Sequence, residues 1–451
     1  MCQMQMACAS DGGRKIRAGL VRRISLNSLH LLFRTLLGAA TSLAVVGIVL
    51  NALGVEDYGV YVSVGCLTAV FLRADSVLQS TACRFLGCVM GRGTDDDLSD
   101  VWSSVLLFAV TVAAVLFVSG ELIGMWILRT RLSIPPARME AAQVVFQGGM
   151  AVAVLKTLQT AFSSLVVMEE RMSCFSLVAV LESALTLGSA GLLRLLPTLR
   201  LEAYALMIFV SAAAVLGFHI AYCRKLFPRV RFAVARSRRE FGEIARFFML
   251  RMLTGVGNAV KIEGVALLVN AFAGVAMSAS WGVAAELRLA FQSVCDSYQQ
   301  ACSPTIYKCM SAGDMRGTRR FLRWEVALSV ALVVLPALVW LIFSQQLLQV
   351  WLGEDCPAGL MPLVACSILW SLVDVVCGPL TVTILACGRI ALFQVVMFAF
   401  AGLCFGGVWM VLSRGFPVWG AMAVVVAVNV LSLVYRLMHI RRAGILREKV
   451  E

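Results

Sequence analysis

Charged and polar side chains recur at helical spacing inside four otherwise apolar stretches of this chain. The four series are Asn27, His30, Arg34, Gly38 and Thr41; Arg73, Ser76, Ser80 and Arg84; Arg251, Thr254, Asn258 and Lys261; and Trp281, Arg288, Gln292, Asp296 and Gln299. Steps of three and four residues place each series on one face of an α-helix. Lipid does not tolerate such faces, so the series predict a polar interior shared by four helices.

These stretches carry more basic than acidic side chains. The six basic residues are Arg34, Arg73, Arg84, Arg251, Lys261 and Arg288, and the nearby acids are Asp75, Glu263, Glu286 and Asp296. A guanidinium group binds two phosphate oxygens at once, and the interaction strengthens away from bulk water. The excess of positive charge therefore predicts a surface that binds a phosphate-bearing ligand. Internal ion pairs that fix helix packing are the alternative, and both interpretations stand for any single residue.

Further charges within apolar stretches are weaker signals, namely Lys156, Glu182 and Asp374. Each could contact a sugar or titrate a proton, but a hydrogen bond inside the helix bundle is the favoured interpretation. A separate set of acids is expected either to pair with the basic side chains or to bind a proton or a sodium ion. That set is Asp75, Glu263, Asp296 and Asp374.

The composition indicates which elements position these residues. The chain has 451 residues, of which 60% are apolar and only 14% charged, whereas a soluble domain is about a quarter charged. About twelve spans of ~20 residues account for this apolar content. A soluble enzyme is therefore excluded. A single anchor carrying a large domain is excluded too, because hydrophobic runs occur along the whole chain.

Apolar windows predict an all-α polytopic membrane protein with twelve transmembrane helices. We place them at 27–50, 58–88, 101–128, 139–167, 172–193, 202–222, 243–271, 275–303, 321–343, 359–386, 389–412 and 417–439. They form an N-terminal six-helix bundle at 27–222 and a C-terminal six-helix bundle at 243–439. The other segments are a cytoplasmic N-terminal segment at 1–26, a basic cytoplasmic linker at 223–242 and a cytoplasmic tail at 440–451.

The orientation follows from the basic connections, because basic loops stay on the cytoplasmic side of a membrane. Lys and Arg concentrate in the N-terminal segment, in 224–239, in 308–320 and in the tail. Even numbers of helices separate these four segments, so all of them, both termini included, are predicted to be cytoplasmic. Three basic residues are exceptions to this rule, because they fall on the predicted outer side. They are Arg129, Arg131 and Arg138. The net charge of +13 is thus interpreted as a topology signal and not as a sign of nucleic-acid binding.

An internal repeat relates the two bundles. Asn51-Ala52-Leu53-Gly54-Val55, between the first two helices, corresponds to Asn270-Ala271-Phe272-Ala273-Gly274-Val275, between the seventh and eighth. Six spans in each unit return the chain to its starting side, so the bundles are predicted to be parallel repeats around a central cavity. Parallel repeats are a transporter architecture, with the substrate site between the halves.

Catalytic and metal-binding patterns are not supported. The fifteen cysteines are scattered, mostly in apolar runs, and their odd number argues against a disulfide framework or a metal site. His30, His219 and His439 are far apart in the sequence. The run Asp95-Asp96-Asp97 lies beside glycines. A solvated turn is therefore a better interpretation of it than the metal site of a glycosyltransferase. We therefore expect no catalytic residue and no metal.

Four segments spread over nearly the whole chain carry a family resemblance. They are Ala52-Leu53-Gly54-Val55-Glu56-Asp57-Tyr58-Gly59-Val60-Tyr61; Thr81-Ala82-Cys83-Arg84-Phe85-Leu86-Gly87; Gly257-Asn258-Ala259-Val260-Lys261 with Leu267-Leu268-Val269-Asn270; and Ser303-Pro304-Thr305-Ile306 before Ser311-Ala312-Gly313-Asp314. In them the chain resembles the polysaccharide or O-antigen flippases of the multidrug/oligosaccharidyl-lipid/polysaccharide exporter superfamily. The resemblance implies a V-shaped cavity that opens alternately to the cytoplasm and the periplasm. It also implies the cargo, an oligosaccharide attached by pyrophosphate to a polyprenyl lipid.

Three classes of function compete. The first is a flippase of the bacterial inner membrane that serves surface polysaccharide synthesis, with the six basic residues above as its binding residues. The second is a multidrug or cation antiporter of the same superfamily, which is expected to carry an acid in the first helix, where this chain has Arg34. The third is a membrane-embedded polymerase or ligase, which would need a larger periplasmic loop than residues 344–359.

The sequence favours the flippase, a transporter and not an enzyme. Its expected partners are the lipid bilayer and the polyprenyl-pyrophosphate-linked glycan, with a polysaccharide polymerase and glycosyltransferases as further partners and no nucleic acid. No cofactor is expected beyond a coupling proton or sodium ion.

A reporter fused at position 230 tests the predicted topology. Because the linker around it is basic, a reporter that is active only in the cytoplasm should be active there, and one that is active only after export should be silent. An exported reporter with full activity at this position would overturn the twelve-helix arrangement.

Overall fold

The computed structural model describes residues 11–90, 95–169, 172–196, 200–226, 238–311, 315–352, 359–386 and 390–442. Within these ranges the chain is helical and holds no β-strand. Ten helical segments of the described chain are long and apolar enough to cross a membrane. Two of them, Phe33–Leu86 and Gly255–Asp296, bend back on themselves and make two crossings each, which gives the twelve predicted helices. The predicted all-α membrane fold is therefore confirmed.

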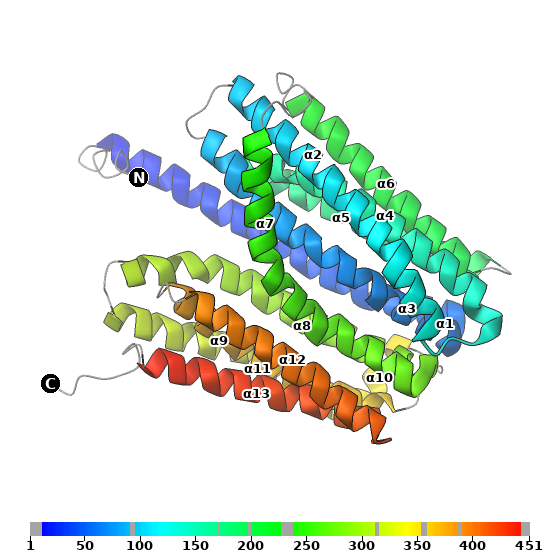
Figure 1. The fold of residues 1–451 in the computed structure, drawn as a ribbon. Coiled ribbons are helices and arrows are strands. Elements are labelled where there is room, and N and C mark those ends of the chain that lie inside the picture. Colours follow the sequence, from blue (N-terminus) through cyan, green and yellow to red (C-terminus); the bar gives the residue numbers. More distant parts are fainter. Residues whose placement is uncertain are drawn as a thin grey trace.

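The N-terminal bundle holds the first half of the chain, the upper half in Figure 1. It comprises α1 (Asp11–Met90), α2 (Asp95–Ser119), the π-helix η2 (Gly120–Gly124), α3 (Met125–Thr130), the 3-10 helix η3 (Pro136–Arg138), α4 (Met139–Met168), α5 (Met172–Leu192), the 3-10 helix η4 (Leu193–Leu195) and α6 (Arg200–Leu226). The segments from α2 to α3 form one crossing. The helix of α1 begins earlier than the predicted residue 27.

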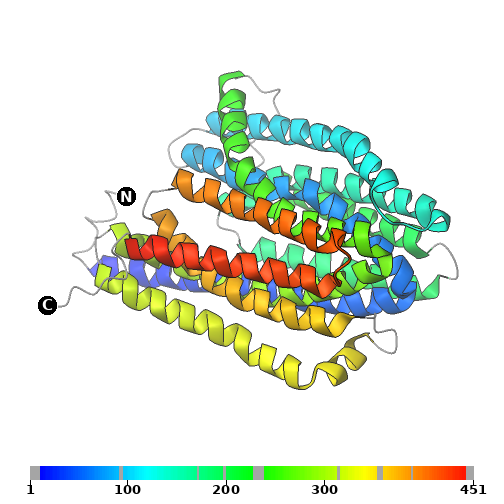
Figure 2. The same cartoon turned by 60° about the horizontal axis from the view of Figure 1, so that its bottom comes forward.

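The C-terminal bundle holds the second half. It comprises α7 (Arg238–Ala259), the π-helix η5 (Val260–Gly264), α8 (Val265–Ser311), α9 (Met315–Ile342), α10 (Ser344–Leu352), α11 (Leu360–Ala386), α12 (Ile390–Ser413) and α13 (Val418–Arg442). The short helix α10 occupies part of the segment that was predicted as an outer loop. Figure 2 shows α9 and α10 at the edge of the molecule.

The same backbone bend occurs near the start of both bundles. Helix α1 bends at Gly54 (φ 81°, ψ 168°) and α8 bends at Gly274 (φ 80°, ψ −178°). This conformation is open essentially to glycine alone. The two bends fall at equivalent places in the predicted repeat, so the correspondence between Asn51–Val55 and Asn270–Val275 marks a real structural repeat.

The two bundles meet closely at the end that carries these bends. A Cβ atom on Gly59 would lie 2.0 Å from the carbonyl oxygen of Val275, so only glycine allows this approach. Asn270 is fully buried; its amide donates to Ser63 Oγ at 2.7 Å, and its Oδ1 accepts the backbone N–H of Ser133 at 3.0 Å. Figure 1 shows the bundles spreading apart toward the end where both termini lie, except for α7, which crosses to the N-terminal bundle and packs against α1 and α2.

Helix α10 adds a further link between the bundles. The indole N–H of Trp351 donates to the backbone oxygen of Leu43 in α1, with 2.5 Å between nitrogen and oxygen. Gly47 leaves the room for this contact, because a Cβ there would lie 2.4 Å from the carbonyl oxygen of Trp351. A helix of the C-terminal bundle is thereby held against the first helix of the N-terminal bundle.

Replacing Gly274 by alanine tests the bend. No atom stands within 4 Å of the added Cβ, so the cost comes from the backbone conformation alone, and we expect a loss of about 1–3 kcal/mol in the free energy of unfolding. Thermal unfolding of the detergent-solubilised protein measures it. Gly402→Ala in α12 is the matched control, since its Cβ also meets no atom and its φ is not positive. Equal unfolding temperatures for the two variants would contradict the argument.

Candidate functional site

A cavity of about 680 Å³ lies between the two bundles. Its wall is built by both arms of α1 and by α4, α5, α6, η5 and α8. The volume falls within the range of about 300–1,000 Å³ that is usual for sites of small ligands. Its charged lining residues, within the described chain, are Arg34, Arg73, Lys156, Glu182, Glu263 and Glu286.

Helix α1 contributes to the cavity on both sides of its bend. Before the bend, Arg34, Gly38 and Thr41 line the wall, at the helical spacing seen in the sequence. After it, the wall runs from Tyr58 to Arg73. The side chains of Asn27 and His30, which share the predicted face, lie outside the described residues.

An ion pair joins the bundles across the cavity. Arg73 Nε donates to Glu263 Oε1 at 3.0 Å, and a second nitrogen of the guanidinium contacts the same oxygen. The Glu263 side chain is only 6% exposed, whereas that of Arg73 is 38% exposed. Glu263 lies in the π-helix η5, an element often found at functional sites. The pair neutralises an acid that would otherwise be buried alone.

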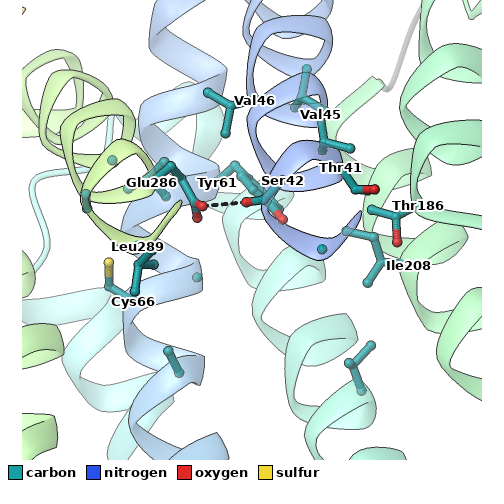
Figure 3. A pocket seen from close by; sticks show the side chains of 18 of the residues that line it. Thr41, Ser42, Val45, Val46, Tyr61, Cys66, Thr186, Ile208, Glu286 and Leu289 are labelled. Carbon is teal, nitrogen blue, oxygen red and sulfur yellow. Dashed lines mark hydrogen bonds between the residues drawn. The ribbon is translucent and has the colours of Figure 1, made fainter. Parts of the chain in front are cut away.

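A second polar contact crosses the cavity at Glu286 of α8. Ser42 Oγ of α1 donates to Glu286 Oε2 at 2.5 Å, as Figure 3 shows. Tyr61 lies beside this contact in the same view. Both acids that the C-terminal bundle presents to the described cavity therefore contact α1 of the other bundle.

The remaining cavity charges belong to the N-terminal bundle. Glu182 of α5 acts electrostatically on Arg34, and Lys156 of α4 acts on Asp75. Asp75 accepts a hydrogen bond from Thr157 at 2.8 Å and lies behind the described wall of the cavity. Asp75 thus helps to pack α1 against α4.

The described cavity wall does not carry the predicted excess of positive charge. Three basic and three acidic residues line it, because Lys156 and Glu182 add to the wall and several predicted cations point elsewhere. The charges differ in exposure, however. Arg34 and Lys156 are exposed, Glu182 and Glu286 are half-buried, and Glu263 is buried. Arg34 and Lys156 are therefore the most exposed of the six charges in the described wall.

Two of the predicted cations form a separate cluster inside the C-terminal bundle. Asp374 lies 3.8 Å from both Lys261 Nζ and Arg288 Nη1. Lys261 also donates to Asn429 Oδ1 at 2.5 Å, and the Arg288 guanidinium lies 4.3 Å from the centre of the Trp370 ring. Arg288 is 4% exposed. This cluster binds α8, η5, α11 and α13 together and lies outside the described cavity wall.

The other predicted residues are dispersed. Arg84 is exposed and lies over the Phe247 ring at 4.2 Å, and Arg251 is exposed on α7. Asp296 is exposed and accepts a hydrogen bond from Gln292 at 3.0 Å. These three residues are not among the described residues of the cavity. The six predicted cations therefore do not converge on one ligand.

The structure also brings forward residues that the sequence reasoning overlooked. Tyr58, Tyr61 and Tyr204 line the cavity with successive ring centroids 6.3 and 5.3 Å apart. Glu325 of α9 is fully buried. The sequence alone could have indicated this residue, because Glu325 is the one acidic residue in the predicted transmembrane helix 321–343. Within the described residues no group of three or more His, Cys, Asp or Glu could hold a metal ion.

Comparisons with known proteins agree with this arrangement. No family model and no curated protein matches the chain. Several solved structures do match the fold of the chain. An inward-facing multidrug resistance MATE family transporter of the MOP superfamily superposes with a TM-score of 0.76 at 12% identity, covering 92% of this chain and 96% of that one. A MOP superfamily transporter from Pyrococcus furiosus gives 0.67 at 11% identity, covering 94% and 96%.

An outward-facing conformation of a MATE family transporter is also similar, with a TM-score of 0.58 at 13% identity over 94% of this chain and 96% of that chain. The chain thus has the two-repeat fold of a multi-pass membrane transporter. In particular, it is the fold of the MATE transporters of the MOP superfamily.

Removing one partner of the cross-cavity ion pair tests its strength. Arg73→Ala leaves Glu263 buried without a counter-charge, and we expect the free energy of unfolding to fall by on the order of 3 kcal/mol. The Arg73→Ala/Glu263→Gln double variant should regain most of this loss, because no lone charge remains. Thermal unfolding measures both, with Arg414→Ala, an exposed arginine after α12, as control. A double variant as unstable as the single one would refute the pairing.

Proposed function

We propose that this protein is an alternating-access exporter of polyprenyl-pyrophosphate-linked oligosaccharide units across the bacterial inner membrane. The observation that carries the proposal is the exposure of the cavity charges. Arg34 and Lys156 reach the cavity as exposed cations, while Glu263 is buried against Arg73. Exposed guanidinium and ammonium groups suit the oxygens of a pyrophosphate.

The other lining side chains suit a glycan. Hydroxyl groups surround the charges, from Thr41, Ser42, Ser183, Thr186, Ser211 and the three cavity tyrosines. Hydroxyls both donate and accept hydrogen bonds, and tyrosine rings add apolar faces. Such a wall offers partners to the alternating polar and apolar surfaces of a sugar.

The transport step follows from the contacts between bundles. In the predicted topology the closed end, at Gly59 and Asn270, faces the periplasm, so the structure corresponds to an inward-facing state. Export then requires this end to open and the cytoplasmic end to close. A bound pyrophosphate competes with Glu263 for Arg73, which loosens a contact that holds the bundles in the present arrangement.

A multidrug or cation antiporter is the second candidate. Glu286 and Glu182 are half-buried acids in the cavity wall that could attract a cationic solute. The similar solved structures include multidrug MATE transporters, and this likeness supports the antiporter more than the flippase. Reconstituted transport separates the two functions.

Purified protein in liposomes tests the proposal with a defined lipid-linked oligosaccharide and, separately, with a cationic dye. For a flippase, Arg34→Ala and Lys156→Ala should lower glycan movement at least tenfold, which is about 1.4 kcal/mol. Arg34→Lys should rescue only in part, because an ammonium keeps the charge but loses the paired donors. Arg414→Ala should be neutral. Dye export that depends on Glu286, with no glycan movement, would establish the antiporter instead.

A further inference from the structure

Glu325 of α9 is a buried acid whose carboxylate oxygens have no hydrogen-bond partner. Its residue is 0% exposed, and both oxygens are enclosed by protein atoms. The same holds for the hydroxyl of Ser329, one helical turn further on, which is also 0% exposed and without a partner. Neither residue belongs to the described wall of the substrate cavity. The arrangement of charges in the cavity therefore does not account for the buried Glu325.

The neighbours of Glu325 that the structure describes on α8 are uncharged. From α8, Tyr298 and Cys302 lie within electrostatic range of the carboxyl group. Cys295 of the same helix donates its thiol to the Ser329 backbone oxygen at 3.9 Å.

The described residues of the other elements around Glu325 bring no counter-charge. Helix α11 packs against α9 through apolar residues such as Leu380 and Val375, while its Asp374 is turned to Lys261 and Arg288. Helix α10 contacts the far end of α9, and Arg323, on α9 itself, is exposed. No ion pair to Glu325 occurs among the described residues.

Such surroundings do not tolerate an ionised carboxylate. Burying an isolated charge without a partner costs far more than binding a proton, so the group is held as the neutral acid. A bound cation would need several oxygen ligands, and no group of three His, Cys, Asp or Glu gathers within the described residues. The ligand that this site fits is a proton.

We infer that Glu325 is a proton-binding site of the transporter, separate from its substrate cavity. Helix α8 connects the two, because it carries Glu286 at the cavity and Tyr298 and Cys302 at Glu325. When α9 separates from α8 within the C-terminal bundle, the carboxyl group meets water and releases its proton. It takes one proton back from water before the contact closes again. Proton and substrate therefore do not compete for one place.

Infrared spectroscopy of the purified protein, with no substrate present, tests the site directly. The wild type should show the carbonyl-stretch band of a buried protonated carboxylic acid at neutral pH. Glu325→Gln, which keeps the size of the side chain, should lose this band. Glu140→Gln, which alters an exposed acid at the start of α4, is the matched control and should keep it. A band unchanged in Glu325→Gln would overturn the inference.

Proton movement in liposomes tests the coupling. Glu325→Gln should lower the proton flux driven by a pH gradient at least tenfold, while Glu140→Gln leaves it unchanged. Loss of the infrared band with full proton flux would reduce Glu325 to a structural acid and refute its role. If Glu325→Gln fails to fold, Glu325→Asp serves, since a displaced carboxyl group must shift the band. Absence of lipid-linked glycan transport in the wild type would remove the proposed substrate but not the proton site, because the band needs no substrate.

Discussion

The intolerance of lipid for unpaired polar groups governs this molecule. Every charge carried into the apolar layer must turn inward and find either a partner or water. The described residues show three such arrangements. Arg73 and Glu263 pair across the cavity, and Lys261 and Arg288 share Asp374 inside one bundle. Arg34 and Lys156 line the cavity, where Glu182 acts on Arg34. The packing of the bundles and the chemistry of the cavity both follow from the position and the partner of each charged side chain.

These solutions have different mechanical consequences. The cluster around Asp374 joins helices of one bundle, so it moves with that bundle as a rigid unit. The contacts of Arg73 with Glu263 and of Ser42 with Glu286 join different bundles and must break whenever the bundles separate. Their acids, Glu263 and Glu286, are those that the described part of the C-terminal bundle presents to the cavity. The cavity is therefore also the place where the two halves hold each other.

The sequence contained the fold but only part of the site. Apolar windows and the corresponding segments 51–55 and 270–275 were enough to predict twelve crossings and a repeat, because each signal is local. Helical spacing also placed Arg34, Gly38 and Thr41 on one face. Spacing cannot reveal how a helix is rotated relative to its neighbours, so Lys261 and Arg288 were assigned to the cavity although they turn into their own bundle. The nine-residue helix α10 was too short to leave a periodic signal.

The hydrogen bond of Trp351 uses a main-chain acceptor, and this shapes how the contact tolerates change. Any residue at position 43 supplies the same carbonyl oxygen, so replacing Leu43 leaves the acceptor in place. The donor side has no such freedom, because only tryptophan brings an indole N–H there. Position 47 is restricted for a separate reason, since a Cβ there would lie against the main-chain carbonyl oxygen of residue 351. The approach of α10 to α1 thus restricts positions 47 and 351 independently of each other, while the identity of the residue that accepts the bond is unrestricted by it.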